Sequence, residues 1–280
     1  MTGPMTRRAL VLGGGGITGI AWEWGILAGL AAGGVDLGDA DLVVGTSAGS
    51  VVGAQVASGL DPEERYQVQL APPDGEIAAA FGPGLLLRYG FAMVAGPRAP
   101  HKVRARIGRL AAHAGTVPEA DRVDVIESRL PVREWPDRAL RITAVDVETG
   151  EFRVFDRTAG VPLARVVAAS CAVPGVWPPV TIDGRRYMDG GVRSGTNADL
   201  AAGYERVVVL APLPHGMGTG AARLVERLRA SSRVELVTPD AAARKAFGRN
   251  LLDPARRAGA ARAGRTQAAS FVDRVRSVWT

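Results

Sequence analysis

Short runs of consecutive apolar residues recur along this chain, and glycine or a helix-compatible segment follows the first two. The first run, Ala9–Leu12, ends in four glycines, and the second, Leu42–Val44, runs into the sequence Gly-Thr-Ser-Ala-Gly. An apolar run without polar alternation predicts a strand that is buried on both faces. Arg206–Leu210, which is apolar after its arginine, predicts another buried strand, and Val234–Val237, which contains Glu235, predicts a last strand.

Helix-compatible segments separate the first strands. One helix is predicted over Thr18–Ala32 and another over Ala48–Ser58, and glycine follows each of them. A third helix is predicted to start at Asp61–Glu64, where a capping residue precedes proline and two acids. The succession of strand, helix, strand and helix predicts an α/β fold with a mostly parallel sheet.

Two hairpins are predicted in the second half of the chain. The first pairs Arg141–Val147 with Phe152–Asp156, and the second pairs Val180–Ile182 with Arg185–Met188 through an Asp-Gly turn. A helix of small residues, Pro162–Ser170, is predicted between them. The second hairpin leads directly into an Asp-Gly-Gly sequence, so an acidic side chain is expected at the end of a strand.

The charge of the chain limits its partners only weakly. The net charge of +6 is carried almost wholly by arginine, and a basic protein attracts phosphate-bearing partners such as an anionic membrane surface. A bias towards alanine, glycine and arginine explains the same composition. Modest clusters lie at Arg104–Arg109 and Arg256–Arg265, but no basic stripe is interleaved with aromatic residues. Nucleic-acid binding is therefore not expected.

The numbers of cysteines and histidines and the hydropathy of the chain exclude several classes of protein. The single cysteine, Cys171, excludes an internal disulfide, and three histidines leave little material for a histidine-based metal site. Arg7 and Arg8 precede an apolar run, but Glu23 and four glycines interrupt the pattern of a signal peptide. No stretch offers the ~20 apolar residues that span a bilayer. We expect a cytoplasmic protein whose membrane contact, if it has one, is peripheral.

The segment Gly45–Gly49 reads Gly-Thr-Ser-Ala-Gly, which is a G-x-S-x-G motif between a predicted strand and a predicted helix. A serine on such a sharp turn has its hydroxyl exposed, and the flanking glycines permit the close backbone approach. The N-terminus of the following helix favours negative charge beside that hydroxyl. The motif predicts a nucleophile at Ser47, although an ordinary turn of small residues has the same composition.

Three motifs in order resemble the patatin-like phospholipase family. The glycine loop G-G-G-x-x-G matches Gly14–Gly19, the nucleophile motif matches Gly45–Gly49, and the D-G-G motif matches Asp189–Gly191. Ala169–Val180 also resembles the small-residue helix and proline-rich approach to the aspartate in that family. The resemblance covers about residues 7–213. It departs from the family at Thr18, where members often carry arginine or lysine.

The resemblance implies a lipid acyl hydrolase on a three-layer α/β/α sandwich with a mostly parallel central sheet. Ser47 would be the nucleophile and Asp189 the general base, with phospholipid, lysophospholipid or simpler acyl-ester substrates and with no cofactor or metal. The oxyanion hole would be formed by the backbone N–H groups of Gly14, Gly15, Gly16 and Ala48. The turns of the two motifs would be supported by Gly45, Gly49, Gly190 and Gly191.

The resemblance also implies a domain organisation. Residues 7–215 would form the hydrolase domain, and residues 216–280 a strand and a helical extension packed on it. Within the domain, residues 71–120 break the strand–helix rhythm with proline and glycine between apolar pieces. That region is either an apolar cap over a lipid-binding cleft or a set of short core helices. The oligomeric state does not follow from the sequence.

Alternative functions remain open at this point. A Ser47–Asp189–His215 triad has the residue order of the α/β-hydrolases. The spacing of Gly14, Gly16 and Gly19 fits a dinucleotide-binding loop, with Asp36 and Asp39 near the expected ~20 residues downstream. A non-catalytic lipid-binding protein of the same fold is a third alternative.

Three polar residues after the D-G-G motif receive smaller hypotheses. Asn197 and Asp199 are predicted to cap a helix. Arg193 is interpreted as an ordinary surface arginine, with an anionic head group as the alternative partner.

Overall fold

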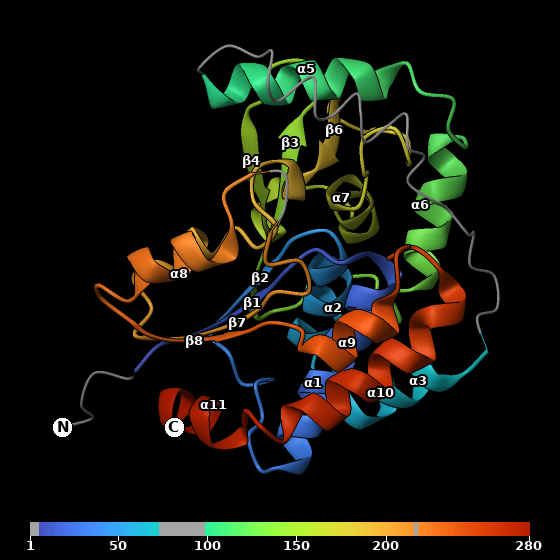
Figure 1. Ribbon diagram of the computed structural model, residues 1–280. Helices are drawn as coiled ribbons and strands as arrows, with labels where there is room; N and C mark the ends of the chain where they lie inside the picture. Colours follow the sequence, from blue (N-terminus) through green and yellow to red (C-terminus); the bar gives the residue numbers. More distant parts are fainter. Residues whose placement is uncertain (1–5, 73–98, 216–217) are drawn as a thin grey trace.

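The computed structural model describes residues 6–72, 99–215 and 218–280, and these form a three-layer α/β/α sandwich around one sheet (Figure 1). The order of the strands in the sheet is β5-β6-β3-β2-β1-β7-β8, and β4 pairs with β3. Pairing is parallel from β3 through β2, β1 and β7 to β8, and antiparallel where β4, β5 and β6 join. The predicted fold class, a mostly parallel α/β/α sandwich, is confirmed.

The described strands and helices have the following bounds. The strands are β1 Arg8–Leu12, β2 Leu42–Gly45, β3 Ala139–Asp146, β4 Phe152–Phe155, β5 Val180–Ile182, β6 Arg185–Asp189, β7 Arg206–Leu210 and β8 Arg233–Val237. The α-helices are α1 Gly16–Ala32, α2 Ala48–Ala57, α3 Pro62–Leu70, α5 Pro100–Ala112, α6 Glu119–Ser128, α7 Leu163–Ser170, α8 Ala221–Leu228, α9 Ala241–Phe247, α10 Arg257–Ala268 and α11 Val272–Trp279. The 3-10 turns are η1 Arg157–Ala159, η2 Gly190–Val192, η3 Ala198–Ala201 and η4 Pro254–Arg256.

Each central strand divides its side chains between two cores. Leu10 and Leu12 of β1 pack into the larger core with α1, α2, α7 and α10, whereas Ala9 and Val11 pack into the smaller core with α8 and η3. The alternation of side chains in a strand produces this division, and helices cover both faces. The uninterrupted apolar runs are therefore strands buried on both faces, as predicted.

The predicted boundaries are close to the observed ones. The first helix starts at Gly16, two residues before the predicted Thr18, because Gly16 adopts a left-handed φ of 62° and turns the chain directly into α1. Asp61 caps α3 as predicted, since its Oδ1 accepts the Glu64 N–H at 2.8 Å. Pro162 is the N-cap of α7 and lies outside the helix.

The last α-helical pair, α10 and α11, packs on the rest of the fold. α10 lies against α1, and small residues allow the two backbones to approach closely (Figure 1). A Cβ added at Gly25 of α1 would lie 2.2 Å from the Ala261 carbonyl oxygen, and one added at Gly264 of α10 would lie 2.4 Å from the Trp22 carbonyl oxygen. Glycine is required at both positions because any side chain would separate the helices.

The sequence predicts either an apolar cap or short core helices over residues 71–120. Residues 73–98 of this region lie outside the described residues, whereas residues 99–120 contain α5 and the start of α6. In the described part of the chain, no helix combines the length and the apolar character needed to cross a bilayer.

Candidate active site

Ser47 lies on the tight turn between β2 and α2. Its backbone has φ 53° and ψ −120°, a left-handed conformation that is uncommon for a residue with a side chain. The turn also brings backbone segments together: a Cβ at Gly45 would lie 2.6 Å from Ser50 Cα, and one at Gly49 would lie 2.1 Å from the Leu12 carbonyl oxygen. Such strain at a serine is characteristic of a nucleophile elbow.

Three side chains fix the backbone of Ser47 in this conformation. The Ser47 N–H donates to Ser170 Oγ at 2.9 Å. The Ser47 carbonyl oxygen accepts from Ser50 Oγ at 2.6 Å and from Cys171 Sγ at 3.3 Å. Ser170 and Cys171 come from the end of α7, 123 and 124 residues further along the chain. Sequence reasoning assigned them no chemical role, and no local pattern marks them as supports of the turn.

Asp189 ends β6 beside this turn. Its side chain is buried, and Oδ1 accepts the Gly191 N–H at 2.7 Å. The Ser47 hydroxyl lies close enough to the carboxyl group to lower its pKa, so the structure brings the two predicted catalytic residues together. Burial nevertheless raises the pKa of the Asp189 carboxyl from 3.8 to about 6, because it outweighs the opposite effects of the Ser47 hydroxyl and the Gly191 N–H.

The D-G-G turn packs tightly on β3. A Cβ at Gly190 would lie 2.2 Å from Thr143 Oγ1, so only glycine fits there. A Cβ at Gly191 would lie 2.9 Å from Asp189 Oδ1, the atom that accepts the Gly191 N–H. Gly190 therefore allows the turn to pack against β3, and the Gly191 N–H holds the carboxylate.

The glycine loop lies against Ser47. A Cβ at Gly14 would be 3.3 Å from Ser47 Cβ and 3.9 Å from Ser47 Oγ. The Gly14 N–H donates to the Gly195 carbonyl oxygen at 2.8 Å, so this group is already engaged. Among the described residues, the N–H groups of Gly15, Gly16 and Ala48 make no backbone hydrogen bond. Of the four predicted oxyanion donors, these three are available.

Thr18 takes the place of the basic residue that is frequent in the glycine loop of the family. Its side chain is buried, and Thr18 Oγ1 donates to the Gly15 carbonyl oxygen at 3.3 Å. The Thr18 N–H donates to the Leu251 carbonyl oxygen at 3.1 Å. Thr18 thus stabilises the loop through hydrogen bonds and adds no charge.

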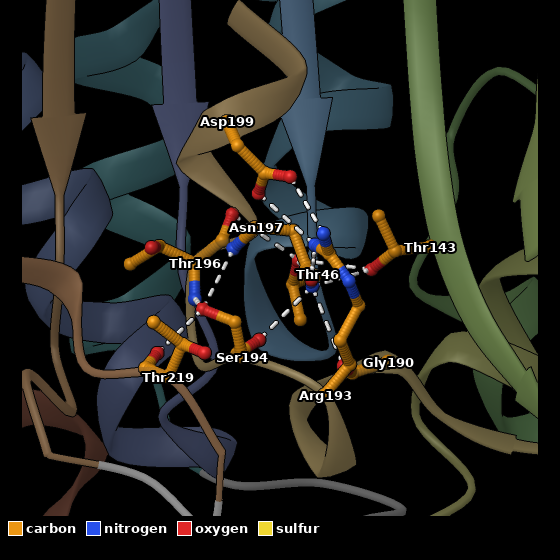
Figure 2. Close-up of polar contacts among 9 residues, drawn as sticks. All are labelled: Thr46, Thr143, Gly190, Arg193, Ser194, Thr196, Asn197, Asp199 and Thr219. Atoms are coloured by element: carbon orange, nitrogen blue, oxygen red, sulfur yellow. Dashed lines mark hydrogen bonds and ion pairs between the residues drawn. The ribbon is translucent and has the colours of Figure 1, made fainter. Parts of the chain in front are cut away.

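Asn197 joins the residues next to Ser47 and Asp189. Its buried side-chain amide lies within hydrogen-bond distance of Thr46 Oγ1 at 3.0 Å and of the Gly190 carbonyl oxygen at 3.3 Å (Figure 2). The amide also contacts Thr143 Oγ1 at 3.2 Å and the Ser194 carbonyl oxygen at 2.9 Å. A single amide therefore holds the nucleophile turn and the D-G-G turn in register.

Two of the smaller hypotheses are wrong. Asn197 precedes η3, but its side chain makes no capping hydrogen bond, because its amide is hydrogen-bonded to the buried Thr46 hydroxyl instead. Arg193 is not an ordinary surface arginine: its guanidinium donates to Asn197 Oδ1 at 2.8 Å and pairs with Asp199 at 2.6 Å (Figure 2). It also lies 4.1 Å from the centre of the Phe152 ring.

His215 does not join the Ser47–Asp189 pair. Its side chain is exposed and lines a separate pocket with Phe247 and Leu251. The polar groups that act on the Asp189 carboxyl group are the Ser47 hydroxyl and the Gly191 N–H. The arrangement therefore favours a dyad over the triad.

The dinucleotide-binding alternative also lacks its acidic partner. Asp36 Oδ1 accepts the Gly38 N–H at 2.7 Å, and the Asp39 carboxylate accepts from Trp279 Nε1 at 2.8 Å and pairs with Arg8. The Leu251 carbonyl oxygen accepts the Thr18 N–H in the first turn of α1, so this N–H group is not available to a pyrophosphate. In the part of the chain that is described, no group of three or more metal-ligating side chains is found.

Comparison with known proteins identifies a family. The model of the family described as patatin-like phospholipase matches residues 10–202. Among solved structures, VipD from Legionella pneumophila is similar with a TM-score of 0.49 and 12% identity over 97% of this chain and 67% of VipD. The type III effector protein ExoU has a TM-score of 0.43 and 17% identity over 97% of this chain and 53% of ExoU.

A further similar structure is the ExoU–SpcU complex of Pseudomonas aeruginosa. Its TM-score is 0.41 and its identity 19%, over 97% of this chain and 52% of the matched chain. The chain spans about half the length of the ExoU chains that it matches. A search of curated proteins found no match.

Proposed function

Because this chain belongs to the patatin-like phospholipase family, we propose that it is a lipid acyl hydrolase with Ser47 as nucleophile and Asp189 as general base. The observation that carries the proposal is that the Ser47 hydroxyl lies close enough to the buried Asp189 carboxyl group to lower its pKa, beside a glycine loop with free N–H groups. A nucleophile within hydrogen-bond reach of its base is the arrangement that covalent catalysis requires. Residues 7–215 would form the hydrolase domain and 216–280 its extension.

The first half of the reaction forms an acyl-enzyme. Ser47 Oγ attacks the ester carbonyl carbon while its proton moves to the Asp189 carboxylate. The carbonyl oxygen becomes an oxyanion, and the N–H groups of Gly15, Gly16 and Ala48, which have no backbone partner, would donate to it. Each such donor typically lowers the barrier by about 3–4 kcal/mol. The tetrahedral intermediate then collapses, and the alcohol leaves with the proton from Asp189.

The second half releases the acid. A water molecule attacks the acyl carbonyl carbon and gives its proton to Asp189, and the collapse returns a proton to Ser47 Oγ. A pKa of about 6 makes Asp189 a stronger base than an exposed aspartate while leaving it ionised at neutral pH. The resident groups therefore suffice for both proton transfers.

The acyl chain has a candidate binding cavity. A cavity of about 240 Å³ begins one helical turn beyond Ser47, at Val51, and apolar side chains of Ile17, Ile20 and Val125 contribute to its wall. Polar side chains, among them Gln55, Arg65 and Arg129, line the rest of the cavity. The apolar part of the wall suits the acyl part of a phospholipid, a lysophospholipid or a simpler ester. The net charge of +6 is compatible with peripheral contact between the protein and an anionic membrane surface.

Labelling with a fluorophosphonate probe tests the nucleophile. The native protein, Ser47→Ala and Ser231→Ala would be compared by mass spectrometry, because Ser231 is an exposed serine that serves as a matched control. We expect labelling of Ser47 alone, no labelling of Ser47→Ala, and native labelling of Ser231→Ala. Release of fatty acid from a phospholipid or a short-chain ester should follow the same pattern. A folded native protein that is neither labelled nor active would overturn the proposal.

A further inference from the structure

A groove of about 550 Å³ lies between α5 and α8, and it does not include Ser47 or Asp189. Each helix lines it with one face. The lining residues of each helix are spaced i, i+3, i+4 and i+7. On α5 they are Pro100, Val103, Arg104 and Ile107. At the start and along the length of α8 they are Gly220, Arg223, Leu224 and Arg227.

Arginine dominates the polar part of the groove. Four arginines line it, at positions 104, 193, 223 and 227, and Asp199 is the one acidic residue among the lining residues. Asp199 forms an ion pair with Arg193 at 2.6 Å. The groove therefore carries an excess of positive charge that its own residues do not neutralise.

The arginines of α8 have no partner among the described residues. No hydrogen bond or ion pair joins Arg223 or Arg227 to another described side chain, and Glu226 between them pairs instead with Arg229. Across the groove, Arg104 Nε donates to the Gly150 carbonyl oxygen at 2.7 Å, which orients its guanidinium. Burial and the nearby charge of Arg193 lower the pKa of Arg104, which shows that these two cations lie close together.

The backbone adds to the positive potential of the groove. Thr219 and Gly220 line it at the N-terminus of α8, and no side chain caps that terminus. Among the described residues, the N–H groups of Ala222 and Arg223 make no hydrogen bond outside the helix. The first turn of a helix favours an anion through these N–H groups and through the helix dipole.

The floor of the groove is rigid and connected to the D-G-G turn. Val192, Arg193 and Ser194 form part of it, three to five residues after Asp189. The Arg193 guanidinium is fixed by Asp199 and Asn197, and Ser194 Oγ donates to the Thr219 carbonyl oxygen at 2.8 Å (Figure 2). These contacts fix the floor of the groove, above which the exposed Arg223 and Arg227 project from α8.

We propose that this groove is a binding site for a phosphate group, held by Arg104, Arg223 and Arg227 and separate from the ester-cleaving site. Guanidinium groups bind phosphate oxygens through two parallel hydrogen bonds, which makes arginine suited to this ligand. The aliphatic side chains of Val103, Ile107, Val192 and Leu224 line the same groove. They would contact an apolar portion of a ligand whose phosphate group lies among the arginines.

The test measures binding by calorimetry in the Ser47→Ala background, so that no ligand is consumed. The probes are inorganic phosphate and dihexanoyl phosphatidic acid, which is a water-soluble phospholipid. The groove variant combines Arg223→Gln with Arg227→Gln. The control combines Arg249→Gln with Arg262→Gln, which removes the same charge from exposed arginines outside the groove. Circular dichroism would verify that both variants are folded.

We expect the groove variant to weaken binding at least about tenfold, whereas the control changes it by less than about twofold. Tighter binding of dihexanoyl phosphatidic acid than of inorganic phosphate would identify a lipid head group as the source of the phosphate. Equal binding of the two would identify free phosphate or a soluble phosphate ester. No binding of either probe, or equal weakening in both variants, would overturn the proposal. None of these outcomes depends on whether Ser47 is a nucleophile.

Discussion

The backbone N–H of Ser47 donates to the side-chain hydroxyl of Ser170 at 2.9 Å. The nucleophile turn is therefore held from outside, by the last residue of α7, and not only by its own glycines. A left-handed backbone at a residue with a side chain costs free energy, and such a conformation persists only when its surroundings fix it. Ser170 is thus a positioning residue for the proposed nucleophile.

Ser170→Ala should impair both stability and reactivity. The variant leaves the buried Ser47 N–H without its acceptor, which costs about 1–3 kcal/mol of unfolding free energy. A displaced Ser47 hydroxyl should also react about tenfold or more slowly with a fluorophosphonate probe. Urea unfolding and labelling rates measure the two effects, with Ser231→Ala as the control. Native values for both in Ser170→Ala would show that the contact is dispensable.

The activity should depend on the ionisation of Asp189. The carboxyl group must be charged to accept the proton of Ser47, and burial raises its pKa to about 6. The value of kcat/KM should therefore fall as the pH drops below about 6, by about tenfold per pH unit, and reach a plateau above that pH. A pH–rate profile with a soluble ester substrate measures this decrease in kcat/KM at acidic pH. A profile that stayed flat well below this pH would contradict the assignment of Asp189 as base.

Asp189→Asn should abolish hydrolysis and yet stabilise the fold. The raised pKa means that the folded state binds the proton more tightly than the unfolded state, so the charged carboxylate destabilises the fold as the pH rises through about 6. The difference between 3.8 and about 6 corresponds to roughly 3 kcal/mol, which is fully expressed above the higher value. An amide removes this penalty.

Thermal unfolding across a pH series measures that gain. It should be largest above pH of about 6 and shrink as the pH approaches the ordinary pKa of an aspartate. The control is Asp137→Asn, because the Asp137 side chain is 99% exposed and its charge has little desolvation cost. A lower unfolding temperature for Asp189→Asn than for the native protein at alkaline pH would contradict the prediction.

His215→Ala separates the dyad from a triad. His215 is exposed, and the polar groups that act on the Asp189 carboxyl group are the Ser47 hydroxyl and the Gly191 N–H. The variant should therefore retain kcat within about twofold of the native value, whereas loss of a triad histidine removes several powers of ten. Steady-state hydrolysis of a short-chain ester distinguishes the two cases. A loss of that larger size would restore the triad.

Sequence patterns predicted the parts of this molecule that depend on local chemistry. The buried strands followed from uninterrupted apolar runs, and the turn at Ser47 followed from glycines whose absent side chains allow backbone contact. Asp189 could be placed at a strand end because its motif directly follows a hairpin. Each of these features is indicated by residues that are neighbours in the sequence.

The contacts that hold the site together come from distant parts of the chain. Asn197 has the local sequence context of a helix cap, but its amide bonds to Thr46, which is 151 residues away. Ser170 lies in an ordinary helix of small residues and becomes relevant only because α7 packs beside Ser47. The groove likewise takes its lining residues from α5 and α8, which lie far apart in the sequence. Such arrangements depend on tertiary packing between distant segments, and no local sequence pattern indicates which segments will meet.

The packing of α10 on α1 is testable with two glycines that differ only in their surroundings. A Cβ at Gly25 in α1 would lie 2.2 Å from the Ala261 carbonyl oxygen and 2.8 Å from the Arg265 nitrogen, both backbone atoms of α10. Gly259, in α10 itself, has no atom within 4 Å of its added Cβ. Alanine is favoured over glycine in a helix by about 1 kcal/mol, so packing alone decides the sign at each site.

Gly25→Ala should therefore lower the free energy of unfolding by about 1–3 kcal/mol, because two backbones must separate. Gly259→Ala should raise it by up to about 1 kcal/mol. Urea unfolding of both variants measures the difference. Since α1 begins at the glycine loop, Gly25→Ala should also slow fluorophosphonate labelling of Ser47 while Gly259→Ala leaves it unchanged. Stabilisation by both substitutions would mean that α10 does not pack on α1 in solution, and that the extension is not part of the hydrolase fold.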